Sequence, residues 1–267
     1  GIPCPVQSTA AMMDFSFSKS TRIFYLPRDV VSGDFYWYNH VESKPVYSNI
    51  YPEKTEEKIL VDFENEKSII AAVDCTGHGI PGAFMSMIGD SLLNQIVLDK
   101  GITKADQILL EMHKGIRKAL HQAESHNPDG MDMSICVIDK VEKVIEFAGA
   151  RNPMLYFQNG EMHYIKGDPF SVGGWLTERE NERVFSYHKV SYAEAPITFY
   201  IYSDGYRDQF GGPKNTKFLR RRFRELLQKI HNEPMTYQRS MLSKALREWM
   251  GDYRQMDDIL IIGVRLD

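Results

Sequence analysis

The sequence has few cysteines and no long apolar run. Its three cysteines, Cys4, Cys75 and Cys136, are an odd set without C-x-x-C spacing. They therefore indicate neither a disulfide framework nor a zinc knuckle, and they fit a reducing, cytoplasmic compartment best. No apolar segment approaches the roughly 18 residues that a membrane span needs, so we expect no membrane contact by this domain.

The sequence also lacks a strong excess of charge of one sign. Its 32 Lys and Arg residues stand against 36 Asp and Glu residues, which gives a formal net charge of -4. This balance argues against a nucleic-acid partner, which would leave a basic footprint. The basic run at residues 220–224 is a local exception, and its helical pattern is typical of a solvated helix face.

Several kinds of catalytic machinery are missing as well. No nucleophile elbow, Cys-x5-Arg loop or phosphate-binding P-loop is present in the sequence. The chain therefore carries no visible apparatus for a covalent enzyme intermediate or for nucleotide hydrolysis.

The 267 residues, 43% of them hydrophobic, are enough for a sizeable core. Residues 1–20 show little periodicity and predict an N-terminal arm or linker remnant, and residues 21–267 predict one domain. The abrupt start at Gly1 leads us to expect a preceding sensor or regulatory domain, which could anchor the full-length protein to a membrane.

The stretch at residues 68–82 organises the rest of the chain. Residues 69–73 form an apolar, β-branched run that predicts a buried strand, and Asp74 ends it. A Gly-His-Gly turn follows, and Pro81 suits the first turn of a helix. Asp74 is thus expected at the end of a rigid strand, beside glycines that let a ligand approach the backbone. A metal ligand and a turn-capping aspartate both fit this pattern.

Aspartates recur at three other predicted strand edges, next to glycine or to a second aspartate: Asp34, Asp204, and the pair Asp257 and Asp258. If these carboxylates converge, their mutual repulsion in a partly desolvated site is severe. Hard divalent cations with oxygen ligands would relieve that repulsion. The pattern therefore favours a site for two Mn²⁺ or Mg²⁺ ions, which could activate a bridging water for attack on phosphorus.

Periodicity elsewhere predicts paired helices and several strands. One helix follows Gly82, and a second is capped by Thr103. The expected buried stripe of the first helix consists of Phe84, Met87, Ile88, Ser91, Leu92 and Ile96. Further predicted helices cover residues 215–231 and 235–250. Predicted strands cover residues 21–26, 133–138, 144–148, 154–157, 162–165, 184–190 and 196–202, with Asn159 and Gly160 closing a hairpin.

Two segments have no regular pattern. Residues 42–67 are polar and contain two prolines, so they predict an irregular insertion on a sheet edge. Residues 167–182 are marked by glycine and proline and predict a mobile loop. Either segment could border a site.

Four short motifs, in order along the chain, resemble those of a known family: Ser32-Gly33-Asp34-Phe35-Tyr36, Asp74-x-x-Gly77-His78-Gly79, Ser203-Asp204-Gly205 and Asp257-Asp258-Ile259-Leu260. The series is similar to that of the metal-dependent protein phosphatases (the PPM, or type 2C-like, family), and more narrowly to its SpoIIE-type branch. Each motif alone is weak, whereas four in order across residues 21–266 are specific. The resemblance implies an α+β fold, an αββα sandwich of two mainly antiparallel β-sheets flanked by pairs of helices.

The resemblance also implies roles for the motif residues. Asp74 would bridge two metal ions, and the Cys75 carbonyl would bind the second of them. Asp204 and Asp257 would complete the first metal site, and Asp34 would hold metal-bound water.

The remaining motif positions have less fixed roles. Asp258 would join the metal site or orient its neighbours, and His78 would orient water or donate a proton to the leaving group. A turn histidine satisfied by the backbone is the alternative for His78. Arg151 and Arg28 are candidates for binding substrate phosphate, because a guanidinium suits bidentate contact with phosphate; a surface ion pair is the alternative for both.

The implied activity is that of a metal-dependent phosphoserine/phosphothreonine protein phosphatase in bacterial signalling, with direct attack by a metal-bridging hydroxide. Substrates in the SpoIIE-type branch are commonly phosphorylated anti-anti-sigma regulators, and the chain could also form a dimer. A pseudophosphatase that binds without turnover is a rival, although the core aspartates are all present. A hydrolase of small phosphoesters is a third reading, which predicts an enclosed pocket in place of an open groove.

The sequence departs from the family pattern in three places. One is Arg151-Asn152-Pro153, which stands where the family often shows Gly-His or Asn-Asn before Pro. Residues 1–20 do not resemble the helix that often couples a regulatory domain to the phosphatase, and residues 42–67 are longer than the expected connection. Any switch that depends on such a helix is therefore in doubt for this chain.

Overall fold

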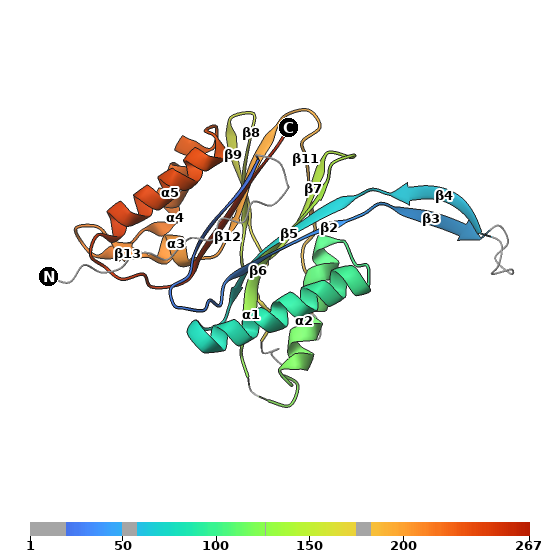
Figure 1. Ribbon diagram of the computed structural model, residues 1–267, viewed down its shortest axis with the longest axis horizontal. Helices are drawn as coiled ribbons and strands as arrows, with labels where there is room; N and C mark the ends of the chain where they lie inside the picture. Colours follow the sequence, from blue (N-terminus) through green and yellow to red (C-terminus); the bar gives the residue numbers. More distant parts are fainter. Residues whose placement is uncertain (1–19, 50–57, 126, 175–182) are drawn as a thin grey trace.

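The computed structural model describes residues 20–49, 58–125, 127–174 and 183–267. These residues form two stacked β-sheets with helices on both outer faces (Figure 1). The predicted αββα sandwich is therefore confirmed. The arm expected at residues 1–20 lies, apart from Ser20, outside the described residues.

One sheet has five antiparallel strands. In spatial order they are β1 (Thr21–Leu26), β15 (Ile259–Leu266), β12 (Ile197–Tyr202), β8 (Met154–Gln158) and β9 (Glu161–Ile165). The predicted hairpin between β8 and β9 is confirmed. Asn159 and Gly160 both have positive φ values, 53° and 78°, as a tight two-residue turn requires.

The second sheet has six strands. In spatial order its path is β11 (His188–Ser191), β7 (Val144–Ala150), β6 (Gly130–Asp139), β5 (Lys67–Cys75) and β2 (Phe35–Val41), and β10 (Val172–Gly173) pairs with β6. The strand predicted at residues 184–190 is wrong in extent, because pairing with β7 begins only at His188.

Helices cover the outer face of each sheet. The first pair is α1 (Gly79–Asn94), continued by the π-helical turn η1 (Gln95–Asp99), and α2 (Ala105–Ala119). The second pair is α4 (Leu219–Ile230) and α5 (Met235–Met250), preceded by the short α3 (Gly205–Asp208) and the small hairpin of β13 (Phe210–Gly211) and β14 (Thr216–Lys217). The helix predicted from residue 215 thus begins later, because residues 216 and 217 pair with β13.

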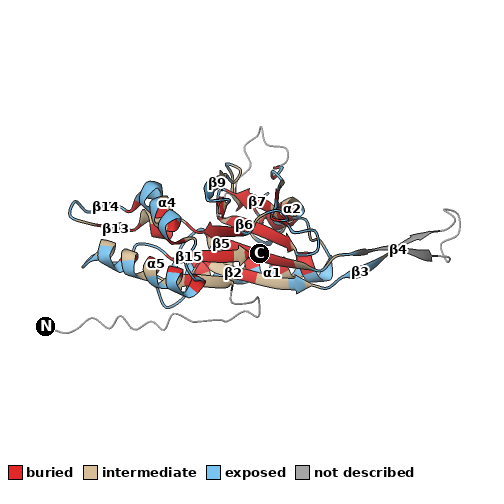
Figure 2. Cartoon of the chain, turned by 90° about the horizontal axis from the view of Figure 1, so that it is seen from above, coloured by how far each residue is buried: buried red, intermediate tan, exposed pale blue. Residues whose placement is uncertain are grey.

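Three apolar layers hold this stack together. Residues of β5 alternate: Ile69 and Ala71 pack with the α1–α2 pair, whereas Ile70 and Ala72 pack between the sheets. This period of two is what a strand buried on both faces requires. The third layer lies under α4 and α5. Figure 2 shows the buried residues running through the strands, while the outer helix surfaces are exposed.

The segment at residues 42–67 is not irregular, as the sequence led us to expect. It forms the antiparallel strands β3 (Lys44–Asn49) and β4 (Lys58–Glu64), and the ribbon extends away from the sheets (Figure 1). Residues 50–57 lie outside the described residues. Pro45 is tolerated because a strand in a two-stranded ribbon has one unpaired edge. The prolines and charges of this segment therefore gave no indication of the strand pair that it forms.

The buried stripe predicted for the first helix is right at three of its six positions and wrong at Phe84, Met87 and Ser91. Ile96 is buried, and Ile88 and Leu92 pack against the core. Phe84 and Met87 are 63% and 69% exposed, and the buried residues of α1 include Gly82 and Gly89. A β-carbon on Gly89 would lie 2.8 Å from the Phe35 ring. The helix therefore approaches β2 so closely that glycines form much of its inner face, which hydrophobicity alone does not signal.

The described part of the chain contains no helix long and apolar enough to cross a bilayer. Cys75 and Cys136 are buried and are not joined in a disulfide, as their spacing led us to expect.

Candidate functional site

The candidate site lies between the two sheets, at one end of the sandwich. Along β5, Ile70 and Ala72 face the layer between the sheets, and Asp74 is the next residue in the same alternating series. Asp74 pairs directly with Asp132 of β6, which places two carboxylates side by side at the end of one sheet.

The same alternation delivers further carboxylates to this end. Tyr36 and Tyr38 of β2 pack on the layer between the sheets, and Asp34 lies two residues before Tyr36. From the other sheet, Asp258 lies two residues before the buried Leu260 of β15. Acidic residues therefore replace apolar ones where the inner layer reaches its edge.

Burial and mutual repulsion raise the pKa values of these groups. Asp34 is only 4% exposed, and its pKa is raised to about 8, first by burial and then by Asp258, Asp257 and Asp204; a hydrogen bond from Ser203 opposes the shift. Burial likewise raises the pKa of Asp74, and the charges of Asp34 and Asp204 raise it further. Carboxylates from the two sheets therefore lie close enough for their charges to interact.

Asp204 and Asp257 belong to the same group. Burial raises the pKa of Asp204, whereas the Arg207 guanidinium opposes that rise. Burial also raises the pKa of Asp257, and the hydrogen bond that the Asp258 amide donates to it acts in the opposite direction. Aspartates from separate motifs are thus brought into one electrostatic cluster, together with Asp132, which lies in no motif. We call this group the acidic cluster: Asp34, Asp74, Asp132, Asp204 and Asp257.

Asp258 organises the loop that carries Asp34. Its Oδ1 accepts a hydrogen bond from the Arg28 amide at 2.7 Å, and its Oδ2 accepts one from the Gly33 amide at 2.8 Å. The side chain is 2% exposed. This carboxylate therefore joins the last strand to the β1–β2 loop, which agrees with the expectation that it orients its neighbours.

The glycines beside the aspartates allow close backbone approach. A β-carbon on Gly33 or on Gly82 would lie 2.5 Å from the Gly77 carbonyl oxygen. A β-carbon on Gly205 would overlap the carbonyl oxygen of Asp258. Because only glycine fits at these positions, the four motifs pack backbone against backbone and bring their aspartates together.

His78 lies at the mouth of the site, immediately before α1. Its Nδ1 is 3.2 Å from Oδ2 of Asp29, and the two side chains are 51% and 40% exposed. A carboxylate at this distance fixes the orientation of an imidazole ring. The structure thus gives His78 a side-chain partner in place of the purely backbone contacts considered as the alternative.

The thiol of Cys75 is not a reactive group. Burial raises its pKa well above the usual range, and the neighbouring Asp74 and Asp34 charges add to that shift. The side chain belongs to the apolar layer under α1 and α2. Any role of Cys75 in binding therefore falls to its carbonyl.

The two arginines predicted to bind phosphate are differently placed. Arg28 Nη1 donates a hydrogen bond to the Met256 carbonyl at 3.0 Å, so its guanidinium is committed to the loop before β15. Arg151 is 58% exposed, and its Nη1 lies 3.8 Å from Oδ2 of Asp132. Asp132 also accepts a hydrogen bond from the Ser171 hydroxyl at 2.5 Å.

The donor chemistry of the acidic cluster fits hard divalent cations. Oδ2 of the buried Asp34 carboxyl has no hydrogen-bond partner, and an unpartnered buried oxygen is costly unless a ligand satisfies it. All the side-chain donors are carboxylate oxygens, as Mg²⁺ and Mn²⁺ prefer. Within the described ranges, however, no three His, Cys, Asp or Glu side chains are drawn together into a ready-made metal site.

Sequence reasoning assigned no role to three residues of the site, although Ser203 stands in one of the four motifs. Asp29 orients His78, Ser203 hydrogen-bonds to Asp34, and Arg207 lies beside Asp204 with 13% of its side chain exposed. Ser203 and Arg207 flank the Asp-Gly motif, and Asp29 lies five residues before Asp34. Their nearness to motif aspartates makes these residues candidates, but nothing in the sequence distinguishes them from ordinary turn residues.

Comparison with known protein families gives one relevant match. The model of the SpoIIE family (stage II sporulation protein E) matches residues 64–267, which contain three of the four motifs. A comparison with curated proteins found no match.

Solved structures with the same fold include bacterial phosphatase domains. The SiaA-PP2C domain of Pseudomonas aeruginosa is 28% identical, with a TM-score of 0.75, and the match covers 94% of this chain and 88% of that one. The structure of the PP2C phosphatase domain and a regulatory-domain fragment of SpoIIE from Bacillus subtilis is 16% identical, with a TM-score of 0.64, over 93% of this chain and 63% of that one. RsbX in complex with magnesium is 14% identical, with a TM-score of 0.56, over 96% and 99%. With the family model matching well over half of its length, the chain belongs to the SpoIIE family of PP2C-type phosphatases.

Proposed function

We propose that this chain is a metal-dependent phosphoserine/phosphothreonine protein phosphatase of bacterial signalling. The observation that carries the proposal is the acidic cluster, in which carboxylates from both sheets raise one another's pKa values at one end of the sandwich. A chain that only needed to fold would gain nothing from this repulsion. The cluster is the arrangement that cationic ligands would stabilise.

Two divalent cations, Mn²⁺ or Mg²⁺, would be held by Asp74, the Cys75 carbonyl, Asp204 and Asp257, with Asp34 beside them. When bound, such ions activate water and stabilise the developing charge on a phosphoryl group. The relative RsbX is described in complex with magnesium. Asp258, whose oxygens both accept backbone hydrogen bonds, would act mainly by fixing the loop before Asp34.

The chain's own side chains would do the remaining work. Asp29 would hold the His78 ring so that one nitrogen faces the site, where it could give a proton to the leaving oxygen. Arg151, half-exposed near Asp132, would attract the incoming phosphate. No side chain in this arrangement needs to form a covalent intermediate.

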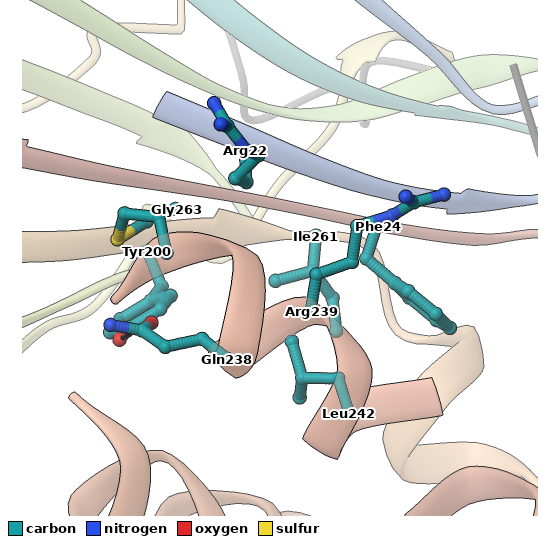
Figure 3. A pocket seen from close by; sticks show the side chains of 9 residues that line it. Arg22, Phe24, Tyr200, Gln238, Arg239, Leu242, Ile261 and Gly263 are labelled. Atoms are coloured by element: carbon teal, nitrogen blue, oxygen red, sulfur yellow. Dashed lines mark hydrogen bonds between the residues drawn. The ribbon is translucent and has the colours of Figure 1, made fainter. Parts of the chain in front are cut away.

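The surface around the acidic cluster supports a protein substrate. Two hollows in the described surface lie elsewhere: one is lined by Phe24 of β1, Tyr200 of β12 and Leu242 of α5 (Figure 3), and the other by Tyr36 and its neighbours. Neither hollow includes a residue of the acidic cluster.

Exposed apolar residues follow His78 along α1. Ile80, Phe84 and Met87 on α1 are 69%, 63% and 69% exposed, and Val30 in the adjoining loop is fully exposed. An open apolar border suits contact with another protein better than enclosure of a small phosphoester. This observation favours the protein phosphatase over the small-molecule hydrolase.

The partners follow from the family. We propose a phosphorylated regulator of the anti-anti-sigma type as substrate, acting in the cytoplasm, and an N-terminal sensor or regulatory domain in the full-length protein, with a dimer as one assembly. Structures similar to this chain include RsbX and one described as part of the bacterial stressosome, which support signalling control.

Hydrolysis of p-nitrophenyl phosphate and of a phosphoserine protein tests the proposal. The domain should be inactive in EDTA and regain turnover with Mn²⁺ or Mg²⁺, whereas Asp204→Asn should stay inactive. Asp99→Asn, which removes an exposed carboxylate outside the site, is the matched control. Two bound metals without turnover on any substrate would support the pseudophosphatase instead, and no metal binding would refute the metal assignment.

A further inference from the structure

Arg207 is the cation most deeply placed in the site, although no motif led to it. It lies in the short α3 turn directly after Asp204, and only 13% of its side chain is exposed. Arg28 and Arg151 are 33% and 58% exposed by the same measure.

The guanidinium of Arg207 has no committed acceptor. Its Nη2 is 4.0 Å from Oδ2 of Asp204, which is too long for a hydrogen bond. No described residue accepts a hydrogen bond from any of its five N–H donors, so these donors are available to a ligand. By contrast, Arg28 donates to the Met256 carbonyl.

The charge of Arg207 acts on carboxylates of both sheets. Its charge opposes the raised pKa of Asp204, at the end of β12, and that of Asp132, in β6. Asp132 has Arg151 on another side. Arg207 therefore places a positive charge among carboxylates of both strands. Once cations occupy those carboxylates, a bound phosphate dianion would need such a positive partner.

We infer that Arg207 binds the phosphoryl oxygens of the substrate, with its unused N–H donors directed at them. The inference rests on the proposed phosphatase function and adds to it the residue that recognises phosphate. A guanidinium presents a rigid fork that matches two phosphate oxygens. Because Arg207 is already largely buried beside Asp204, little side-chain entropy is lost when phosphate binds.

A second role is possible for a buried arginine beside two carboxylates: it can serve only as a counter-ion that keeps Asp204 in place. The two roles predict different consequences when Arg207 is substituted. Loss of a counter-ion lowers the melting temperature or changes metal affinity, whereas loss of a phosphate ligand weakens phosphate binding and leaves the metals bound.

The test uses Arg207→Ala and Arg207→Lys in the whole chain, with Arg221→Ala as the matched control. Arg221 is 88% exposed on α4 and pairs with Glu225. Its substitution therefore removes the same charge at a position away from the site. Calorimetry measures the affinity of Mn²⁺ and then of inorganic phosphate for the metal-loaded protein. Steady-state kinetics with a phosphoserine peptide give KM and kcat separately.

We expect Arg207→Ala to weaken phosphate binding and raise KM about 10- to 100-fold, the range for a hydrogen-bonded charged group. Arg207→Lys should recover part of the loss, since it keeps the charge without the fork, and it replaces Arg207→Ala if that variant fails to fold. Mn²⁺ affinity should not fall in either variant, and Arg221→Ala should behave as the wild type.

Unchanged phosphate affinity in an active Arg207→Ala protein, with a lowered melting temperature or altered Mn²⁺ affinity, would overturn the inference alone. A wild-type protein that binds phosphate through Arg207 yet hydrolyses no substrate would overturn the proposed function alone. A metal-loaded wild type with no measurable affinity for phosphate would refute the role of Arg207.

Discussion

The layer between the two sheets has a dry part and an acidic part, although both come from the same alternating positions. In the dry part, Ile70, Phe199 and Ile262 are almost fully buried and pack across the two sheets. At the acidic end, Asp34 and Asp74 continue the same strand faces and repel each other. The comparison teaches that one part of the layer supplies the stability that lets the other keep a costly set of charges.

The largest effect is expected from removing a carboxylate of the acidic end. Asp74→Asn and Asp204→Asn should each lower phosphatase activity by more than about 100-fold, the upper range for residues that only orient metal ligands. Calorimetry should show that Mn²⁺ binding is lost with the activity. Unfolding in EDTA should show no loss of stability, because repulsion is relieved. Near-wild-type rates in both variants would contradict the metal assignment.

Truncation of a side chain in the dry part should lower the stability of the fold and leave the activity unchanged. Ile262→Ala removes a fully buried side chain and should lower the free energy of unfolding by about 2–5 kcal/mol, since it leaves a cavity. Activity per folded molecule should be unchanged. Chemical denaturation measures the first quantity and titrated active protein the second. Val141→Ala, at a 65% exposed position, is the control and should change stability by less than about 0.5 kcal/mol.

A smaller effect is expected where the two parts meet. A β-carbon on Gly205 would overlap the Asp258 carbonyl oxygen, so Gly205→Ala should cost about 1–3 kcal/mol of stability and move Asp204. Mn²⁺ affinity, measured by calorimetry, should fall with it. Gly160→Asn, in an open turn where φ is 78°, tests whether any glycine substitution has this effect; equal losses in both variants would remove the special role of Gly205.

The pH dependence of the metal-free protein should give the smallest signal. The pKa of Asp34 in the folded chain is raised to about 8 from its ordinary 3.8. Protonation therefore favours the folded state, and this stabilisation is lost as the pH rises through about 8. In EDTA the melting temperature should be a few degrees higher at pH 6 than at pH 8.5. Asp34→Asn should flatten that slope, and a melting temperature that rises with pH in the wild type would contradict the shift.

Much of the fold was predictable because strand alternation and motif order are local signals. Asn159 and Gly160 indicated the β8–β9 hairpin. The aspartates of the four motifs each lie near a glycine or a second aspartate. The sandwich itself came from the resemblance that these motifs carry.

The features that were missed depend on contacts between distant segments. Glycines form part of the inner face of α1, because the helix lies against Gly33 and Phe35. Hydrophobic spacing therefore wrongly placed Phe84 and Met87 on that face. Asp29 and Arg207 acquire meaning only when the loops before β2 and after β12 reach the acidic cluster. No residue pattern within one segment contains that information.

The ribbon of β3 and β4 has a practical consequence. Val41 of β2 and Lys67 of β5 are paired neighbours, and the chain between them leaves the sandwich and returns to the same place. Residues 42–66 could therefore be exchanged for a two-residue Asn-Gly turn, or made to carry a fluorescent label, without altering the strand ladder on which Asp34 and Asp74 are mounted. The β3–β4 ribbon thus provides an attachment point for immobilisation and single-molecule measurement, away from the acidic cluster.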